Sequence, residues 1–455
     1  MQEINKDSPS AEWISAIRRR FTVEKEIDRI LTRKLERRSG PRYSPIPLAS
    51  LVQGVESLLR AEIGDTFEIK DARWLSGGAS KLQMAFTLEW NRPGAGFEKT
   101  AMVLRMEPAE SIVETSRLRE FQLLKACEGV VPVPSAFWCD AQARHLPYPA
   151  LIYGFAPGVT KPSNGSSGVS GLGTHLPEQV RDRLAPQFVA NLAAIHLHDY
   201  GNANLSAFDV PSIGTTQCAE WGIDHWDRIW EEDSDEDIPL MRVVSAWLHR
   251  NMPVLDRASI VHSDYRTGNF LFTEDDLKIS AWLDWELGRI GDRHQDLAWT
   301  TNRAFGHLDQ DGKTFLVCGL MPEAKFFEQY EKASGMPVFA KTVHWYKVYN
   351  SYSIAVLTLA TGYRIARNGK THQDVLVTWL IGIGYMILEE VRTLIAMENE
   401  HADAARSRDR QRNQGDDRCG NPGDRSCQQA CDRTIPTDHR TAESVEYPVA
   451  PAVPL

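Results

Sequence analysis

Two short segments constrain the fold of this chain more than any other part of its sequence. They are IVHSDYRTGN at residues 260–269 and WLDWE at residues 282–286. The first segment carries Asp264 and, five residues later, Asn269, and the second carries Asp284. The apolar residues between the two segments predict two short strands joined by an acidic turn. Such a hairpin would bring Asn269 and Asp284 to one edge.

The order and spacing of these side chains are typical of a phosphoryl-transfer site, as protein kinases arrange them. Asp264 is the candidate group that accepts the proton of an acceptor hydroxyl or holds that hydroxyl in line. Asn269 and Asp284 offer hard oxygen ligands suited to Mg²⁺. Arg266 is the candidate cation for charge that develops on the transferred group, with a structural salt bridge as the competing interpretation. His262 is expected to brace the loop backbone.

A glycine-containing turn, LSGGASK, lies between two predicted strands in the first third of the chain. Gly77, Gly78 and Ser80 would let the backbone approach phosphates without a Cβ clash. A turn of this kind alone is weak evidence, because any hairpin could carry it. Its place before the predicted strand that contains VLR at 103–105 strengthens the interpretation.

Three further positions complete the predicted nucleotide site. Arg105 is expected to pair with the α- and β-phosphates, and Glu120 on the following helix is expected to hold it. Glu107 and Glu114 are alternative partners. The apolar strand LIYGF, with Ile152 and Tyr153, should supply a hinge whose backbone meets adenine.

The chain resembles the aminoglycoside phosphotransferase and choline kinase group in landmarks that follow one another in the same order. These are LSGGASK, VLR, REFQLL, VPVP, AIHLHDY, AWLHRNMP, IVHSDYRTGN and WLDWELGRIGDRHQDLAW. The likeness is greatest to the branch fused to acyl-CoA dehydrogenases in animals and free-standing in bacteria. It covers residues 48–300 and weakens beyond them. The resemblance implies an α+β, protein-kinase-like fold, with a small antiparallel-sheet N-lobe and a mainly helical C-lobe, and ATP with Mg²⁺ as cofactors.

The resemblance also implies the reaction, which is phosphorylation of a small-molecule hydroxyl. Ser263 stands where the family usually has glycine, and Arg105 stands where antibiotic kinases carry lysine. Some relatives in the acyl-CoA dehydrogenase branch phosphorylate hydroxyacyl-CoA thioesters, so this acceptor class comes first. An aminoglycoside or amino-alcohol acceptor comes second, and the acidic run 231–237 could attract such a cation, although a solvated helix end is the more economical interpretation. A catalytically silent nucleotide-binding scaffold is the alternative from another class.

Composition excludes some partners and predicts a location. The formal net charge is −10, which argues against nucleic acid as the main partner. The seven cysteines show no CxxC pair, so we expect a reducing cytoplasm. The first residues lack the apolar core of a signal peptide. The apolar run 375–388 is too short to span a bilayer and predicts a buried helix.

The predicted organisation has four parts. Residues 1–45 form an N-terminal helical extension based on the rhythm of residues 13–37, which would pack on its own domain or serve as a homodimer contact. Residues 46–158 form the N-lobe and residues 159–398 form the C-lobe. From about residue 399 apolar residues nearly vanish, which predicts a disordered tail over 399–455.

Overall fold

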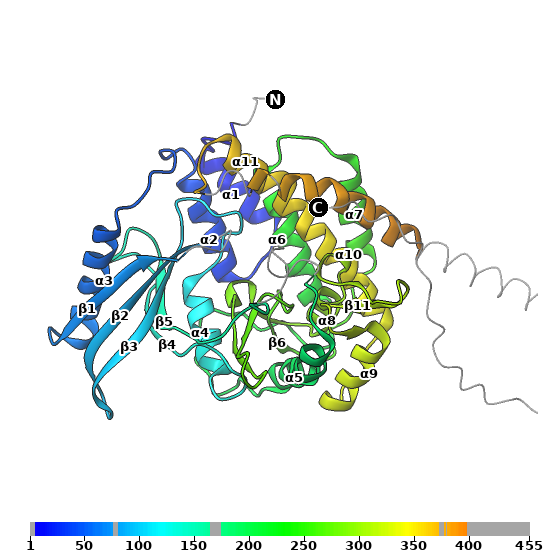
Figure 1. Ribbon diagram of the computed structural model, residues 1–455. Helices are drawn as coiled ribbons and strands as arrows, with labels where there is room; N and C mark the ends of the chain where they lie inside the picture. Colours follow the sequence, from blue (N-terminus) through cyan, green and yellow to red (C-terminus); the bar gives the residue numbers. More distant parts are fainter. Residues whose placement is uncertain (1–4, 76–80, 164–173, 373–376, 379, 398–455) are drawn as a thin grey trace, which may run out of the picture. The chain divides into compact units, whose positions relative to one another are not determined.

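The computed structural model describes residues 5–75, 81–163, 174–372, 377–378 and 380–397 (Figure 1). The chain divides into a unit of residues 1–394 and a unit of residues 395–455. Everything below concerns the first unit. The predicted phosphate-loop residues Gly77, Gly78 and Ser80 lie outside the described residues, as does the tail 399–455.

The N-lobe contains a five-stranded antiparallel sheet with the order β1-β2-β3-β5-β4. Its strands are β1 (Phe67–Trp74), β2 (Leu82–Arg92), β3 (Gly96–Met106), β4 (Ala136–Asp140) and β5 (Ala150–Gly154). Sequence periodicity predicts all of these strands except β4. That strand has only five residues, and only its pairing with β5 distinguishes it from irregular extended chain.

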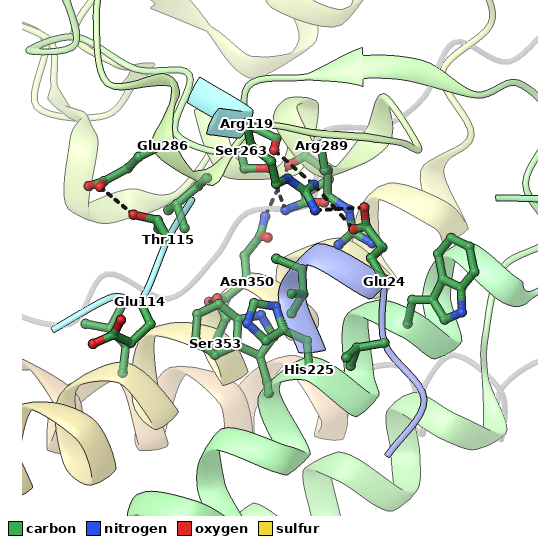
Figure 2. A pocket seen from close by; sticks show the side chains of 18 of the residues that line it. Glu24, Glu114, Thr115, Arg119, His225, Ser263, Glu286, Arg289, Asn350 and Ser353 are labelled. Carbon is green, nitrogen blue, oxygen red and sulfur yellow. Dashed lines mark hydrogen bonds and ion pairs between the residues drawn. The ribbon is translucent and has the colours of Figure 1, made fainter. Parts of the chain in front are cut away.

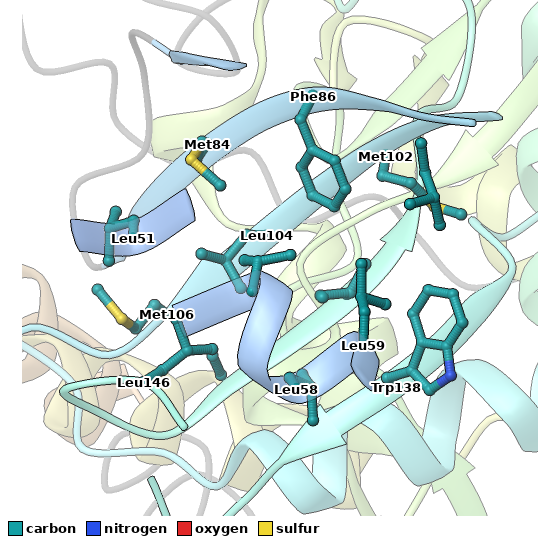
Figure 3. Close-up of a cluster of buried hydrophobic side chains, with 14 of the residues drawn as sticks. Leu51, Leu58, Leu59, Met84, Phe86, Met102, Leu104, Met106, Trp138 and Leu146 are labelled. Carbon is teal, nitrogen blue, oxygen red and sulfur yellow. The ribbon is translucent and has the colours of Figure 1, made fainter. Parts of the chain in front are cut away.

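Two helices flank this sheet. Helix α3 (Leu48–Ile63) contributes apolar residues spaced three and four residues apart, Leu51, Val55, Leu58 and Leu59, to a core shared with the strands (Figure 3). Leu51 and Leu59 are fully buried there. Helix α4 (Arg117–Cys127) begins five residues later than the helix predicted from residue 112, because the Ser116 side chain caps it by accepting from the Arg119 N–H.

The C-lobe is mainly helical. Its longer helices are α5 (Glu178–Leu197), α6 (Gln217–Asp233), α7 (Pro239–Arg250), α9 (Glu323–Ser334) and α10 (Ala340–Val356). The helix predicted over 343–366 is interrupted by a π-helical segment, Leu357–Gly362, before α11 (Tyr363–Arg367). A small sheet of β10 (His307–Leu308), β11 (Phe315–Val317) and β12 (Met321–Pro322) was not predicted, because strands of two or three residues have no readable periodicity.

The N-terminal extension is two helices, not the single helix predicted over 13–37. Helix α1 (Ala11–Arg20) ends where Phe21 becomes extended, and α2 (Lys25–Glu36) follows. The Thr22 N–H donates to an Asp224 carboxylate oxygen at 2.7 Å, which fixes the break between the helices. The extension therefore packs on its own chain. A homodimer contact through it stays a prediction.

The acidic run 231–237 is not the solvated segment that its composition suggests. Glu232 and Asp233, at the end of α6, are fully buried. Lys34 from α2 lies 2.7 Å from Glu232 and 3.1 Å from Asp233, and Arg38 also pairs with Asp233. The prediction was wrong for these two residues, because Lys34 and Arg38 lie almost 200 positions away in the sequence, and Arg228, four residues before Glu232, is buried together with it.

No helix among the described residues combines the length and the apolar character that crossing a membrane requires.

Candidate functional site

The site is built on the hairpin that the sequence predicts. Strand β7 (Phe270–Phe272) pairs with β8 (Ile279–Trp282), and the Leu283 N–H donates to the Asn269 carbonyl at 2.7 Å. This bond places Asn269 directly beside the residue that precedes Asp284. The three candidate polar residues therefore share one end of the hairpin.

His262 ties the two segments together. Its Nδ1 accepts the Asp264 N–H at 3.2 Å, so its Nε2 carries the proton and donates to the Leu283 carbonyl at 2.9 Å. The predicted bracing role is confirmed. One imidazole thus fixes the backbone of the loop that carries Asp264 relative to the turn that carries Asp284.

The Asp264 carboxylate is held by three donors. Arg266 Nε and Trp299 Nε1 each donate to Oδ1 at 2.7 Å, and the Asn269 amide donates to Oδ2 at 2.5 Å. Burial raises the pKa of Asp264, and the Arg266 guanidinium opposes that rise. Arg266 also lies over the Phe305 ring, 5.0 Å from its centroid. Arg266 therefore forms a salt bridge, as the competing interpretation predicted. Its contact with Asp264 also leaves it beside the place where a transferred phosphoryl group would lie.

The backbone between His262 and Asp264 has an unusual conformation. Ser263 has a φ of 66°, in the left-handed region. Asp296 holds it there, because its two carboxylate oxygens accept the His262 and Ser263 N–H groups at 2.8 and 2.7 Å. Asp296 thus tethers the loop that carries Asp264.

Asn269 and Asp284 suit a divalent cation. The Asn269 amide nitrogen donates to the main-chain carbonyl and the carboxylate of Asp264, so its side-chain oxygen is the group that can face a cation. The Asp284 side chain is 32% exposed in a left-handed turn, and its carboxylate pairs with Arg105. These hard oxygen donors fit Mg²⁺, which usually completes its shell with water and phosphate oxygens.

Arg105 and Glu120 meet as predicted, 3.4 Å apart between Nε and Oε1. Arg105 also pairs with Asp284 and, at 3.3 Å, with Glu286. Of the alternative partners, Glu107 pairs instead with Lys81 and Arg117. Arg105 thus links the N-lobe sheet to the turn beyond β8.

The sequence analysis missed a buried ionic network around Glu286. The Glu286 carboxylate lies 3.0 Å from Lys81 Nζ and 3.0 Å from an Arg117 nitrogen, and it accepts the Thr115 hydroxyl at 3.1 Å. Lys81 is the last residue of the glycine-containing motif, and its side chain is fully buried. A lysine directly before a buried strand was the one available signal.

The predicted hinge residues lie on β5, beside β3. Ile152 pairs with Leu104 and Tyr153 with Val103, so the strand that carries Arg105 runs directly alongside them. Both residues are buried. β5 lies between β3 and β4, so the backbone of both residues is inside the same sheet that presents Arg105.

A second group of acidic and histidine side chains lies close by but is already satisfied. His294 Nδ1 donates to Asp292 at 2.6 Å, and its Nε2 accepts the Phe339 N–H at 3.1 Å. Asp256 pairs with Arg293 at 2.6 Å. Although Asp256, Asp292 and His294 could together surround a cation, these bonds show structural bracing.

A cavity of about 80 Å³ opens beside the loop that carries Asp264. Ser263 and Trp299 line it from the loop and α8 (His294–Thr300), and Arg289 lines it from β9 (Arg289–Gly291). Its remaining walls come from the N-terminal extension, α4, α6 and α10. Figure 2 shows Arg119, Ser263 and Arg289 close together, with Glu286 and Thr115 on the other side. Of the aromatic segment 345–350, Tyr349 and Asn350 line the cavity, whereas Trp345 and Tyr346 are core.

A model of the phosphotransferase enzyme family matches residues 76–339, more than half of the chain. The chain belongs to this family. The predicted family resemblance is therefore confirmed. As a member of this family, the chain is a phosphotransferase with an alcohol group as acceptor.

A solved structure from Ralstonia eutropha, described as an aminoglycoside phosphotransferase, has the same fold as this phosphotransferase. It superposes with a TM-score of 0.53 at 21% identity, over 75% of this chain and 98% of that chain. The two-lobed kinase-like fold is therefore confirmed.

The curated relatives that match this chain are much longer proteins. Acyl-CoA dehydrogenase family member 10 of Mus musculus is 22% identical over 268 residues, 56% of this chain. Acyl-CoA dehydrogenase family member 11 of Gallus gallus is 30% identical over 189 residues, 38% of this chain. Each match spans only 24% of the relative's length.

Proposed function

We propose that this phosphotransferase uses ATP and Mg²⁺ to phosphorylate the hydroxyl of a small metabolite, with a hydroxyacyl-CoA as the leading acceptor class. The single observation that carries the proposal is the shared end of the β7–β8 hairpin. There the Asp264 loop and the Asp284 turn are joined by the Leu283 to Asn269 bond and by His262. The acyl-CoA class is supported by the names of the matched relatives.

In this proposal the polar groups at the end of the hairpin divide into two roles. Asp264 orients the acceptor hydroxyl and takes its proton, because its carboxylate is fixed by Arg266, Trp299 and Asn269. Asn269 and Asp284 hold Mg²⁺, which would neutralise charge on the nucleotide phosphates.

The nucleotide itself would meet the N-lobe. Arg105 contacts its phosphates, and Glu120 keeps Arg105 in place. The β5 backbone at Ile152 and Tyr153 receives adenine. Arg266 stabilises the charge that develops on the transferred phosphoryl group. Its ion pair with Asp264 would place it beside the attacked phosphorus.

Replacement of the proposed base tests the assignment. Asp264→Asn should keep nucleotide affinity and lower turnover by about two orders of magnitude or more, because a positioned proton acceptor is lost. Turnover is read as ATP-dependent mass gain on hydroxyacyl-CoA acceptors, and nucleotide affinity by calorimetry. Asp237→Asn, at a carboxylate that is 69% exposed, is the matched control and should behave as the wild type. A near-normal rate for Asp264→Asn would remove the proposed role.

Two alternatives are separated by the same assay. An aminoglycoside or amino-alcohol kinase would phosphorylate cationic acceptors in preference to acyl-CoA. The support that the acidic run gave to this alternative is weakened, because Glu232 and Asp233 are buried in ion pairs. A silent scaffold would bind nucleotide and give no turnover on any acceptor.

A further inference from the structure

Arg289 differs from the other buried arginines of the described chain in having no carboxylate partner. It is 8% exposed, and its hydrogen bonds are long ones, to the Tyr349 hydroxyl at 3.3 Å and the Cys218 carbonyl at 3.4 Å. Its Nε has no hydrogen-bond partner. Every other buried arginine among the described residues pairs with an acid: Arg38, Arg105, Arg117, Arg119, Arg228, Arg293 and Arg364.

A buried guanidinium without a carboxylate partner destabilises the folded state. Taking a charge out of water is unfavourable by several kcal/mol unless a partner compensates it. A structure that keeps such a group beside a cavity favours an anion as the occupant of that cavity. Arginine suits this task, because its planar fork matches the oxygens of a carboxylate or a phosphate.

The cavity places Arg289 close to the proposed transfer chemistry. Arg289 on β9 pairs in register with Val261 on β6 (Ser259–Val261), three residues before Asp264. Ser263 and Trp299 line the same cavity, and Trp299 donates directly to Asp264. Asp264 thus follows one residue of the cavity wall and is bonded to another, and Arg289 belongs to the same wall.

The acids that line the cavity do not neutralise Arg289. Glu24 attracts it but is engaged by Arg119 at 2.9 Å. Glu286 is paired with Lys81 and with Arg117, which lie outside the lining. Burial and the charge of Glu107 raise the pKa of the third acid, Glu114, which favours its neutral form.

The imidazole of His225 lies in the same positively charged environment as Arg289. His225 lines the cavity, and its Nε2 has no hydrogen-bond partner. Burial, followed by the charges of Arg289, Arg119 and Arg228, lowers the pKa of His225 to about 3. His225 is therefore neutral at physiological pH and leaves Arg289 as the uncompensated charge of this wall.

We infer that Arg289 is a specificity-determining residue that binds an anionic oxygen group of the acceptor, either the carboxylate of a hydroxy acid or a phosphate of CoA. The inference rests on the proposed function, since it assigns the acceptor to the same site. A cavity of about 80 Å³ holds only a group of a few atoms, given that one water needs roughly 10–15 Å³. A carboxylate and a single phosphate group both fit this size.

Three forms of one acceptor decide the question in the full-length protein. They are a short hydroxy acid such as 3-hydroxybutyrate, its CoA thioester, and its uncharged N-acetylcysteamine thioester. In the wild type, kcat/KM should be at least tenfold higher for one of the charged forms than for the neutral form. Preference for the acid assigns Arg289 to the carboxylate, and preference for the CoA thioester assigns it to a phosphate.

Arg289→Gln should abolish that preference, mainly by raising KM for the charged acceptor at least tenfold, and should leave the neutral acceptor unchanged. Arg289→Lys should keep part of the preference, because it keeps the charge without the planar fork. Arg257→Gln changes an exposed arginine and is the matched control. Equal effects of Arg289→Gln on all three acceptors, or no preference in the wild type, would overturn the inference.

The inference stays testable if Arg289→Gln does not fold or if none of the acceptors is phosphorylated. In the first case the wild type and Arg289→Lys carry the comparison. In the second, the rise in melting temperature caused by 3-hydroxybutyrate or by CoA is compared between the wild type and Arg289→Gln, and an equal rise in both refutes the role of Arg289. Phosphorylation of all acceptors that is insensitive to Asp264→Asn would instead refute the proposed function.

Discussion

Ser263 adopts a left-handed backbone conformation, with a φ of 66°, that side chains with a branched Cβ hardly tolerate. The two N–H bonds to Asp296 hold it in this conformation. The resemblance predicted glycine at this position, and the φ angle gives the physical reason for that family preference, because glycine has no Cβ to clash. A serine is small enough to be accepted at a modest cost.

Substitution at residue 263 should therefore depend on the shape of the side chain. Ser263→Val should lower the free energy of unfolding by about 2 kcal/mol, because a β-branched residue is strained in this region. It should also lower turnover, since it displaces the neighbouring Asp264. Ser263→Gly is the matched control and should keep both stability and turnover near wild-type values. Denaturant titration and steady-state kinetics check the pair, and equal behaviour of the two variants would contradict the strain argument.

Glu110 gives a pH dependence of stability with a definite sign. Burial raises the pKa of Glu110 to about 7, although Arg38 and Lys370 oppose the rise. An acid with a raised pKa stabilises the fold in its protonated form, so its contribution is present below the unfolded pKa of about 4.5 and is lost as the pH rises through 7.

Glu110→Gln should remove that loss. The variant should match the wild type in melting temperature near pH 4.5 and exceed it by a few degrees at pH 8, because the amide keeps the neutral form at every pH. Thermal unfolding followed from pH 4.5 to 8 checks this. A gap between the two proteins that narrows toward pH 8 would contradict the sign.

At the scale of elements, the joint between α2 and the end of α6 contains a fully buried carboxylate, Asp233. Burial alone would raise the pKa of Asp233, but Lys34 and Arg38 lower it far below its usual range. The Thr361 hydroxyl, from the π-helical segment, donates to the same carboxylate at 2.5 Å. One carboxylate thus connects the N-terminal extension, α6 and the segment that follows α10.

Removal of this charge should loosen all three elements. Asp233→Asn should lower the free energy of unfolding by about 3–5 kcal/mol, because the buried Arg38 loses its carboxylate partner and the buried Lys34 keeps only Glu232. Asp237→Asn, four residues further along the same acidic run but exposed, should change it by less than about 0.5 kcal/mol. Chemical denaturation measures both variants. A similar small loss for each would mean that the run behaves as the solvated segment its composition predicts.

The hairpin site and this joint show what the sequence can predict and what it cannot. The spacing of Asp264, Asn269 and Asp284 is local, and a hairpin converts that spacing directly into proximity. By contrast, Asp233 pairs with Lys34, which lies 199 positions away, and Glu286 accepts a hydrogen bond from Thr115, which lies 171 positions away. No period or motif encodes such a pairing, so a charged residue that is destined for burial looks the same as one on the surface.

At the scale of the molecule, the N-lobe and C-lobe meet through charge. Asp284 and Glu286 follow the C-lobe hairpin, and they pair with Lys81, Arg105 and Arg117 of the N-lobe. The Arg105 to Asp284 pair joins the two groups that the proposed function assigns to phosphates and to Mg²⁺. Binding of the metal and nucleotide would therefore replace a direct contact between the lobes with one made through the ligand.

Asp284→Asn should uncouple Mg²⁺ from the nucleotide. In the wild type, a non-hydrolysable ATP analogue should raise the melting temperature more with Mg²⁺ than without it, because the bound ligand stabilises the folded state. In Asp284→Asn the Mg²⁺-dependent part of the rise should disappear, while the part without metal remains. Differential scanning fluorimetry with and without EDTA measures both parts. Persistence of the Mg²⁺-dependent rise would show that Asp284 does not hold the cation.

Part of the cavity proposed for the acceptor is built from residues that lie before the family region. Val23, Glu24 and Ile27 line it, and the family match begins only at residue 76. This wall therefore lies outside the part of the chain that the family model describes. A hybrid protein that carries a relative's leading segment would test how far the wall sets acceptor preference.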